Sequence, residues 1–175
     1  MEYRLPRLED RELLRDYIEE HYARHEKNLS ASHMLTSMNF EDWIEKINKN
    51  VTIPDPEWGR SLTYLVFDND KLIGLLSIRF DLNNKMADTY GHIGYGVRPT
   101  ERNKGYATRM LKFALDECKR LGLDSVILGC YKDNIGSSKT IIKNGGVLIR
   151  EEDDYGYSNE YWELNLVNLF YEIKL

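Results

Sequence analysis

One stretch, residues 92–121, constrains the fold more than any other part of this 175-residue chain. Apolar residues alternate with small or polar ones from His92 to Val97, which is the period of a β-strand. Pro99 cannot continue a strand ladder, so the strand ends there. From Ala107 to Leu121, apolar residues return every three or four positions, the stripe of an amphipathic helix. The stretch therefore predicts a strand, a turn and the N-terminus of a helix.

The turn between strand and helix is basic. Between residues 98 and 109, four Arg or Lys side chains stand against one Glu, in a chain whose net charge is -5. A helix start offers unpaired backbone N–H groups and the positive end of the helix dipole, and Gly105 lets a ligand approach the backbone closely. These features predict an anion site suited to a pyrophosphate. An ordinary basic helix cap is the plainer alternative.

At this point the sequence resembles a family. Arg102-x-x-Gly105-x-Ala107, directly after a strand, resembles the acyl-CoA pyrophosphate loop of the GNAT N-acetyltransferases, (Arg/Gln)-x-x-Gly-x-(Gly/Ala). A second feature lies downstream, where Asn134 and Ser137 match the family's Asn-x-x-(Ala/Ser). Capping a helix would also satisfy Asn134. The resemblance implies acetyl-CoA as co-substrate and N-acetyltransferase activity.

Composition limits the alternatives. With 42% hydrophobic and 30% charged residues, the chain is typical of one globular domain, which we expect to span residues 1–175. The pI near 5.5 argues against nucleic acid as the main partner. We expect no membrane span and no signal peptide, because no apolar run has the required length. Cys118 and Cys130 lack a CxxC spacing, which favours reduced thiols and a cytoplasmic location.

The remaining segments predict the fold class. We expect strands at 3–5, 62–67, 72–80, 92–97, 125–131, 147–152 and 161–166, helices at 9–25, 40–51, 107–121 and 134–144, and loops at 28–39 and 81–90. The strand–helix–strand unit from His92 to Cys130 makes its two strands parallel neighbours. The order predicts an α/β (α+β) domain with a mixed, mostly antiparallel twisted sheet and helices on both faces, which agrees with the GNAT layout. The tail 167–175 extends the last strand or pairs with a second chain, so a homodimer is possible.

The resemblance also implies where the cofactor lies. In GNAT proteins the fourth and fifth strands splay apart, and the pantetheine arm lies between them, bonded to the backbone of the fourth. This implies that backbone groups of Tyr95 and Val97 hold pantetheine, and that the Val97 N–H polarises the thioester carbonyl. Arg102, Lys104 and Arg109 would add charge. The expected cofactor-binding residues are Tyr95, Val97, Arg102, Asn103, Lys104, Gly105, Tyr106, Ala107, Thr108, Asn134 and Ser137.

The catalytic groups are harder to assign. An amine with a pKa near ~10.4 must lose a proton before it attacks, and the leaving thiolate must be stabilised. The family often has a Tyr seven residues after the conserved Asn, but here that position is Ile141. His92 is a candidate base with poor geometry, because strand alternation puts it on the face opposite Val97. Tyr95 and Tyr131 are left as candidate acids.

Weaker candidates surround these two tyrosines. Tyr90 is a looser candidate acid, and Ser138 could donate a proton or simply pack. Cys130 could accept an acyl group, but no base pairs with it in the sequence, so a small buried hydrophobe is the better interpretation. His21 and His25 are four apart, a metal-like spacing on a helix, but no third ligand is evident and we expect no metal.

Three functions remain open. The first is an acyl-CoA-dependent N-acetyltransferase that acts by direct attack in a ternary complex on an amine-bearing small molecule or protein. The second, motivated by Ile141, is a non-catalytic acyl-CoA-binding or sensing module of the same fold. The third is a nucleotide binder, which is disfavoured because Pro99 replaces the third glycine of GxGxxG.

Overall fold

The computed structural model describes residues 1–82, 84–153 and 166–175, without the side chains of 84–86. The strands of these residues form two hydrogen-bonded sheets. The first has the order β1-β2-β3-β4, with β1 (Glu2–Arg4), β2 (Ser61–Asp68), β3 (Lys71–Arg79) and β4 (Ile93–Val97). The second has the order β5-β7-β6, with β5 (Ser125–Tyr131), β6 (Val147–Asp153) and β7 (Val167–Lys174). Every ladder in both sheets is antiparallel.

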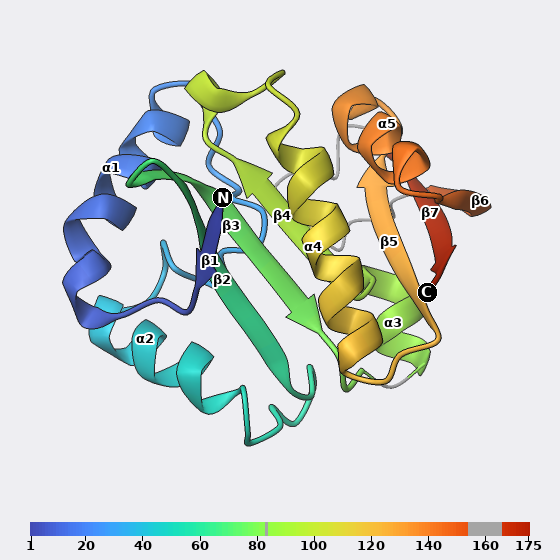
Figure 1. The fold of residues 1–175 in the computed structure, drawn as a ribbon, viewed down its shortest axis with the longest axis horizontal. Helices are drawn as coiled ribbons and strands as arrows, with labels where there is room; N and C mark the ends of the chain where they lie inside the picture. Colours follow the sequence, from blue (N-terminus) through green and yellow to red (C-terminus); the bar gives the residue numbers. More distant parts are fainter. Residues whose placement is uncertain (83, 154–165) are drawn as a thin grey trace.

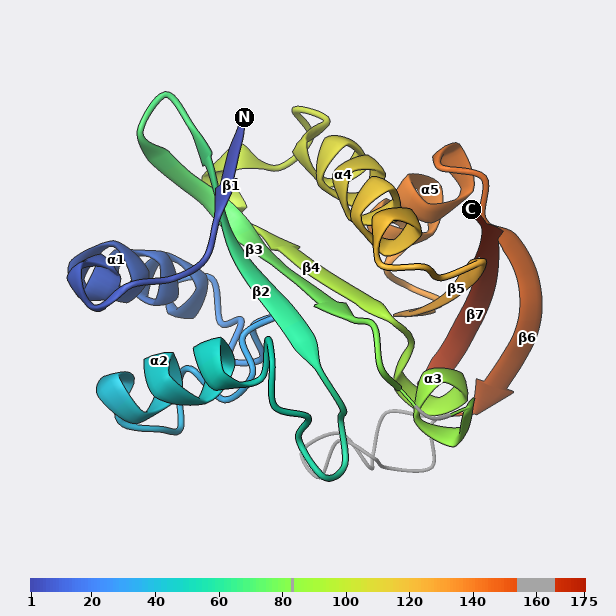
Figure 2. The same ribbon diagram turned by 60° about the horizontal axis from the view of Figure 1, so that its bottom comes forward.

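Helices cover both faces of the first sheet. α1 (Arg11–Tyr22) and α2 (Phe40–Lys49) lie on one face, whereas α4 (Tyr106–Arg120) lies on the other, with α5 (Ile135–Lys143) beside it (Figure 2). Each face has its own core because side chains alternate along the strands. In β3, Leu75 packs toward α1 and α2, and Leu76 packs toward α4. Two 3₁₀ turns, η1 (Leu8–Asp10) and η2 (Pro99–Glu101), complete the connections.

The two sheets meet where β4 and β5 begin. The His92 backbone N–H donates to the carbonyl of Ile127 at 2.7 Å, and the Ile127 N–H donates to Nδ1 of His92 at 3.0 Å. From there β4 and β5 run in the same general direction and diverge (Figure 1). The predicted fold class is confirmed, and the two strands of the strand–helix–strand unit are parallel neighbours without a shared ladder.

Two expectations about the elements were wrong. Residues 81–90 are not all loop, since α3 spans Asn84–Tyr90. The first helix ends at Tyr22 and His25 has a φ of 61°, so His21 and His25 do not share a helix face. The predicted strand at 161–166, apart from Leu166, and the predicted turn at 154–157 lie outside the described residues, and the tail forms β7.

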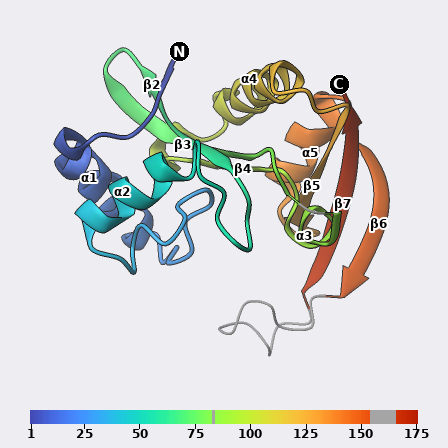
Figure 3. The same ribbon diagram turned by 90° about the horizontal axis from the view of Figure 1, so that it is seen from below.

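The position of β7 decides how the tail pairs. β7 lies between β5 and β6, so both of its edges are occupied within this chain. β6 forms the outer edge of the second sheet (Figure 3). Within the described ranges, none of the helices has the length and apolar character needed to cross a membrane.

Candidate functional site

A cleft of about 1050 Å³ opens between β4 and β5. Its walls come from β4, the end of β5, the loop at 101–108, the start of α5 and the segment that follows α1. Of the expected cofactor-binding residues and the two candidate acids, all except Lys104 line it: Tyr95, Val97, Arg102, Asn103, Gly105, Tyr106, Ala107, Thr108, Tyr131, Asn134 and Ser137. The fold thus brings together residues that are up to 42 positions apart, as in the Tyr95–Ser137 contact.

The backbone of β4 offers polar groups to this cleft. The Arg98 N–H donates to the Ile73 carbonyl at 2.8 Å, and the His92 carbonyl accepts from the Arg79 N–H at 2.7 Å. In an antiparallel ladder such bonds recur at every second residue. The N–H groups of Tyr95 and Val97 therefore point away from β3, toward β5. They have the orientation needed to bond an extended ligand lying beside β4.

The glycines of β4 lie on the face of the strand that packs against the segment following α1. A Cβ at Gly96 would lie 3.1 Å from both the carbonyl oxygen of Ser30 and the hydroxyl of Tyr17. A Cβ at Gly94 would meet Ala31 at 3.8 Å. The segment after α1 therefore lies directly on β4 at Gly96, where a side chain would disturb it. Close packing accounts for this glycine without a ligand.

The start of α4 has the features of an anion site. Gly105 takes the left-handed conformation with φ of 78°, and a Cβ there would meet nothing within 4 Å. No side chain caps the helix among the described residues, so the first N–H groups of α4 have no intrahelical partner. The residues present therefore fit a pyrophosphate, because its oxygens can approach the bare backbone at Gly105.

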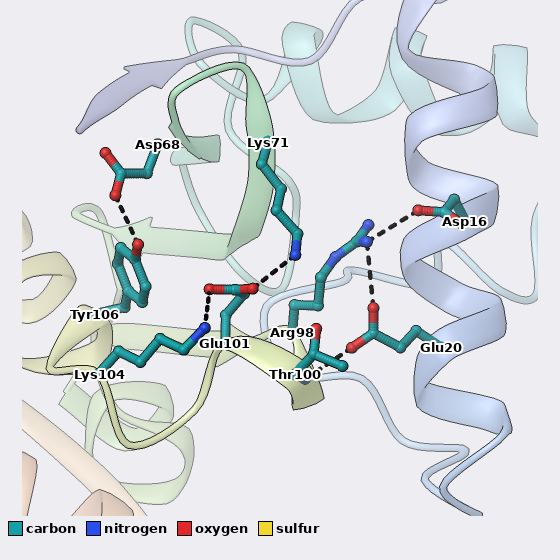
Figure 4. Close-up of polar contacts among 9 residues, drawn as sticks. All are labelled: Asp16, Glu20, Asp68, Lys71, Arg98, Thr100, Glu101, Lys104 and Tyr106. Carbon is teal, nitrogen blue, oxygen red and sulfur yellow. Dashed lines mark hydrogen bonds and ion pairs between the residues drawn. The ribbon is translucent and has the colours of Figure 1, made fainter.

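The basic side chains near this loop are less free than the sequence suggests. Arg98 is buried, and its Nη1 lies 2.9 Å from Asp16 and 3.2 Å from Glu20, both on α1 (Figure 4). Glu20 also accepts from the Thr100 N–H at 2.8 Å. Arg98 therefore joins the end of β4 to α1 and does not face the cleft.

Lys104 is held in a second network on the other side of the loop. The buried Glu101 accepts from Lys104 at 2.9 Å and from Lys71, on β3, at 2.6 Å (Figure 4). Beside them, the Tyr106 hydroxyl donates to Asp68 of β2 at 2.6 Å. Lys104 is thus engaged by Glu101 and does not line the cleft. Arg109, which was expected to add charge, does not line it either and lies over the Tyr106 ring.

Arg102 is also paired, but inside the cleft. Its two terminal nitrogens donate to the two carboxylate oxygens of Glu26, each at 2.6 Å, and its Nε donates to the Val97 carbonyl at 3.1 Å. Glu26 also accepts from Nδ1 of the buried His21 at 2.8 Å. The Arg102 hydrogen bonds lower the pKa of Glu26, and burial lowers that of His21. The charge-assisted pair therefore persists at neutral pH.

Tyr95 reaches across the cleft to α5. Its hydroxyl shares a hydrogen bond of 2.9 Å with Oγ of Ser137, and the Ser137 N–H donates to the Asn134 side chain at 3.1 Å. Burial raises the pKa of Tyr95 to about 12. The phenol is thus protonated at neutral pH and can donate a hydrogen bond into the cleft. Asn134 caps α5, as the plainer alternative predicts.

The other catalytic candidates have less suitable surroundings. Tyr131 and Tyr90 line the cleft, and each has further interactions. Burial raises the pKa of the Cys130 thiol, which disfavours the thiolate. Ser138 shares a bond of 2.7 Å with Tyr171. His92 accepts from the Ile127 N–H, which occupies its Nδ1 in joining the sheets.

Sequence reasoning missed several residues of the cleft wall. Glu26, Ser30, Lys139 and Phe170 line it, and none belongs to a recognised motif. The one feature noted in this region of the sequence was the four-residue spacing of His21 and His25. In the structure His21 contacts Glu26 instead. Within the described part of the chain, no three His, Cys, Asp or Glu side chains gather in a way that could hold a metal ion.

Solved structures share this fold along the whole chain. An acetyltransferase, yncA of Salmonella typhimurium, solved with acetyl-CoA, has 14% identity and a TM-score of 0.68 over 99% of this chain and 93% of its own. RimL, a ribosomal L7/L12 α-N-protein acetyltransferase in complex with coenzyme A, has 18% identity and a TM-score of 0.71 over 99% and 93%. A GNAT-family acetyltransferase of Streptococcus pneumoniae has 17% identity and a TM-score of 0.71 over 99% of both chains.

The sequence itself matches a family model but no curated protein. The family model described as the acetyltransferase (GNAT) family matches residues 13–141, a range that contains β4, the 102–108 loop and most of α5. This match covers well over half of the chain, and the chain belongs to the acetyltransferase (GNAT) family.

Proposed function

We propose that the chain transfers the acetyl group of acetyl-CoA to a primary amine by direct attack in a ternary complex. Its family and its cleft both support this function. The observation that carries it is the alignment of three groups on one cleft: the outward N–H groups of β4, the uncapped start of α4 at Gly105, and the protonated phenol of Tyr95. When bound, acetyl-CoA supplies an activated thioester.

Each of these groups has a distinct role. The Tyr95 and Val97 N–H groups bond the pantetheine arm, and the Val97 N–H polarises the thioester carbonyl. The N–H groups from Asn103 to Thr108 hold the pyrophosphate. Asn134 and Ser137 flank the arm from α5 and keep the Tyr95 hydroxyl in place.

Proton transfer follows from the same geometry. Tyr95 donates its proton to the leaving thiolate and regains one from solvent after the product has left. Tyr131 is the second candidate for this role. The acceptor ammonium loses its proton to water in the cleft, because His92, the candidate base just before β4, accepts from the Ile127 N–H at Nδ1 and does not line the cleft. Positioning supplies most of the rate enhancement.

The acceptor class stays open between a protein amino group and a small amine. The names of RimL and of a Salmonella typhimurium enzyme that modifies the N-terminal serine of ribosomal protein L7/L12 make a protein N-terminus the first class to test. The assay is thiol release from acetyl-CoA with peptides of free N-terminus, polyamines and amino acids. Amine-dependent release that falls in Tyr95→Phe supports the proposal. Tight acetyl-CoA binding without release on any amine supports the non-catalytic module instead.

Three further features belong to the proposal. Residues 1–175 act as one domain, and the buried, unpaired Cys118 and Cys130 suit a cytoplasmic location. A homodimer would use the outer edge of β6, where Val147, Leu148 and Ile149 are exposed, rather than β7. Sedimentation of the wild type and Leu148→Lys tests this arrangement.

A further inference from the structure

Each of the three guanidinium nitrogens of Arg102 has a partner within the chain. The guanidinium makes two bonds of 2.6 Å to Glu26 and one of 3.1 Å to the Val97 carbonyl. Two parallel bonds to one anion are also what a guanidinium makes with a phosphate. The carboxylate of Glu26 therefore occupies the position that an anionic ligand of Arg102 would take.

The position of Glu26 also allows it to release Arg102. It lies beyond the end of α1, on the cleft wall, and its side chain is 33% exposed beside an Arg102 side chain that is 42% exposed. Solvent weakens such a pair, so a dianionic ligand can compete for Arg102. Two neighbouring cations are also engaged within the chain, since Arg98 pairs with Asp16 and Glu20, and Lys104 pairs with Glu101.

We propose that Glu26 competes with the pyrophosphate of acetyl-CoA for Arg102. In the free protein Glu26 neutralises Arg102, and in the complex the pyrophosphate takes over Arg102 while Glu26 turns away. This inference rests on the proposed pyrophosphate site at the 102–108 loop. It adds a residue that lowers cofactor affinity, from a segment outside the family's motif.

Release of Glu26 from Arg102 has a consequence for the segment that follows α1. Glu26 begins the segment 26–34, which packs on β4 through Ser30 at Gly96 and Ala31 at Gly94. Within this segment Ala31, His33 and Met34 have positive φ. Non-glycine residues in that region carry strain that surrounding contacts must offset. The Arg102–Glu26 pair is one such contact, so its loss loosens the segment. Binding of acetyl-CoA thus couples to the mobility of this segment.

Two further contacts keep the segment from unfolding when Glu26 leaves. The carbonyl of Ser32 accepts from Nε1 of the buried Trp43 at 2.8 Å, and His33 shares a bond of 2.5 Å with Ser77 of β3. Both anchors lie after the contact with Gly96. Loosening is therefore expected between residues 26 and 31 and not beyond Ser32.

The test is calorimetric titration of acetyl-CoA, S-acetylpantetheine and inorganic pyrophosphate into the wild type and Glu26→Gln. Gln keeps the size of Glu and can still accept from His21. The variant should bind acetyl-CoA and pyrophosphate about two- to fivefold more tightly, the range expected for a solvent-exposed ion pair. S-acetylpantetheine lacks the pyrophosphate, so its affinity should not change. Unchanged or weaker acetyl-CoA binding in Glu26→Gln would overturn the inference.

Two controls separate the causes. Glu19→Gln removes the same charge from α1, but Glu19 is exposed and pairs with Arg15, so this variant should bind like the wild type. An equal gain in Glu19→Gln would mean that only net charge matters, which overturns the inference. If Arg102→Gln leaves acetyl-CoA affinity unchanged, the pyrophosphate site itself is misplaced; if it weakens binding while Glu26→Gln has no effect, only the competitor role fails.

Hydrogen exchange tests the coupling separately. In the free protein, amides at 26–31 should exchange faster in Glu26→Gln than in the wild type, and those at 35–38 should not change. Acetyl-CoA should then alter exchange at 26–31 less in the variant than in the wild type. Tighter binding without any change in exchange would retain the competitor and refute the coupling.

Discussion

Replacing Tyr95 with Phe removes only one hydroxyl and leaves the β4 backbone in place. The change deletes the 2.9 Å bond to Ser137, which is worth about 1 kcal/mol. For a chain of this length we expect the melting temperature to fall by about 2–4 °C. The affinity for acetyl-CoA should persist, because the pantetheine contacts proposed for this residue come from its backbone.

The expected loss is in kcat. A positioned general acid contributes about 10²–10⁴-fold. A thiol has a pKa near 8.5 and its thiolate leaves readily, so we expect the low end, about 100-fold, at neutral pH. Burial raises the pKa of Tyr95 to about 12, so the phenol of the wild type is protonated throughout the pH range of the assay. The assay is steady-state thiol release with the best amine of the panel.

Tyr64 provides a matched control. Its hydroxyl bonds to Glu117 at 3.2 Å, and its pKa is also raised to about 12, but it lies on β2 away from the cleft. Tyr64→Phe should lose similar stability and no activity. If Tyr95→Phe retains kcat within about threefold while Tyr131→Phe loses it, the acid is Tyr131; if both retain it, water carries the proton and the role given to Tyr95 is refuted.

Three further predictions concern the loop, the sheet and the dependence of stability on pH. Gly105→Asn should fold, because Asn tolerates the left-handed φ of 78° and a Cβ there meets nothing, but acetyl-CoA affinity should fall by about tenfold or more in calorimetry. Gly74→Ala would place its Cβ 2.1 Å from the Gly96 carbonyl oxygen and should cost about 3 kcal/mol in urea unfolding, whereas Gly94→Ala should cost little. Burial lowers the pKa of His33 to about 4, so the unfolded state, with a pKa near ~6.5, binds more protons between these values. Stability is then complete above pH ~6.5 and falls by about 3 kcal/mol toward pH ~4, and His33→Asn, which tolerates the positive φ of 47°, should flatten this slope in urea unfolding.

The parts of the fold with strong local signals were predictable. β5 occupies the predicted range 125–131, and α4 begins within one residue of its predicted start because the apolar stripe and Gly105 mark it. Asn134 caps α5 as expected, since its side chain accepts from the Ser137 N–H. These features depend on residues that are close in the sequence, so they can be recognised from one sequence alone.

Features that depend on distant neighbours were not predictable. α3 has seven residues and a largely polar sequence, and it packs beside β5, a contact that the local sequence does not reveal. β7 lies between β5 and β6, and nothing local distinguishes this order from an edge position. The pairing of Arg102 with Glu26 joins residues 76 positions apart. The sequence therefore predicted a free cation where the fold provides a paired one.

The most direct test of this account is a thermal shift of the wild type and Arg102→Glu with acetyl-CoA, CoA, NAD and ATP. At about 100 times its dissociation constant, a ligand stabilises the fold by about 2.7 kcal/mol, which raises the melting temperature of a chain this size by several degrees. The wild type should show such a shift with acetyl-CoA and CoA, and Arg102→Glu, where a second carboxylate faces Glu26, should lose it. No shift with acetyl-CoA, or a larger one with NAD or ATP, would contradict the assignment of this cleft.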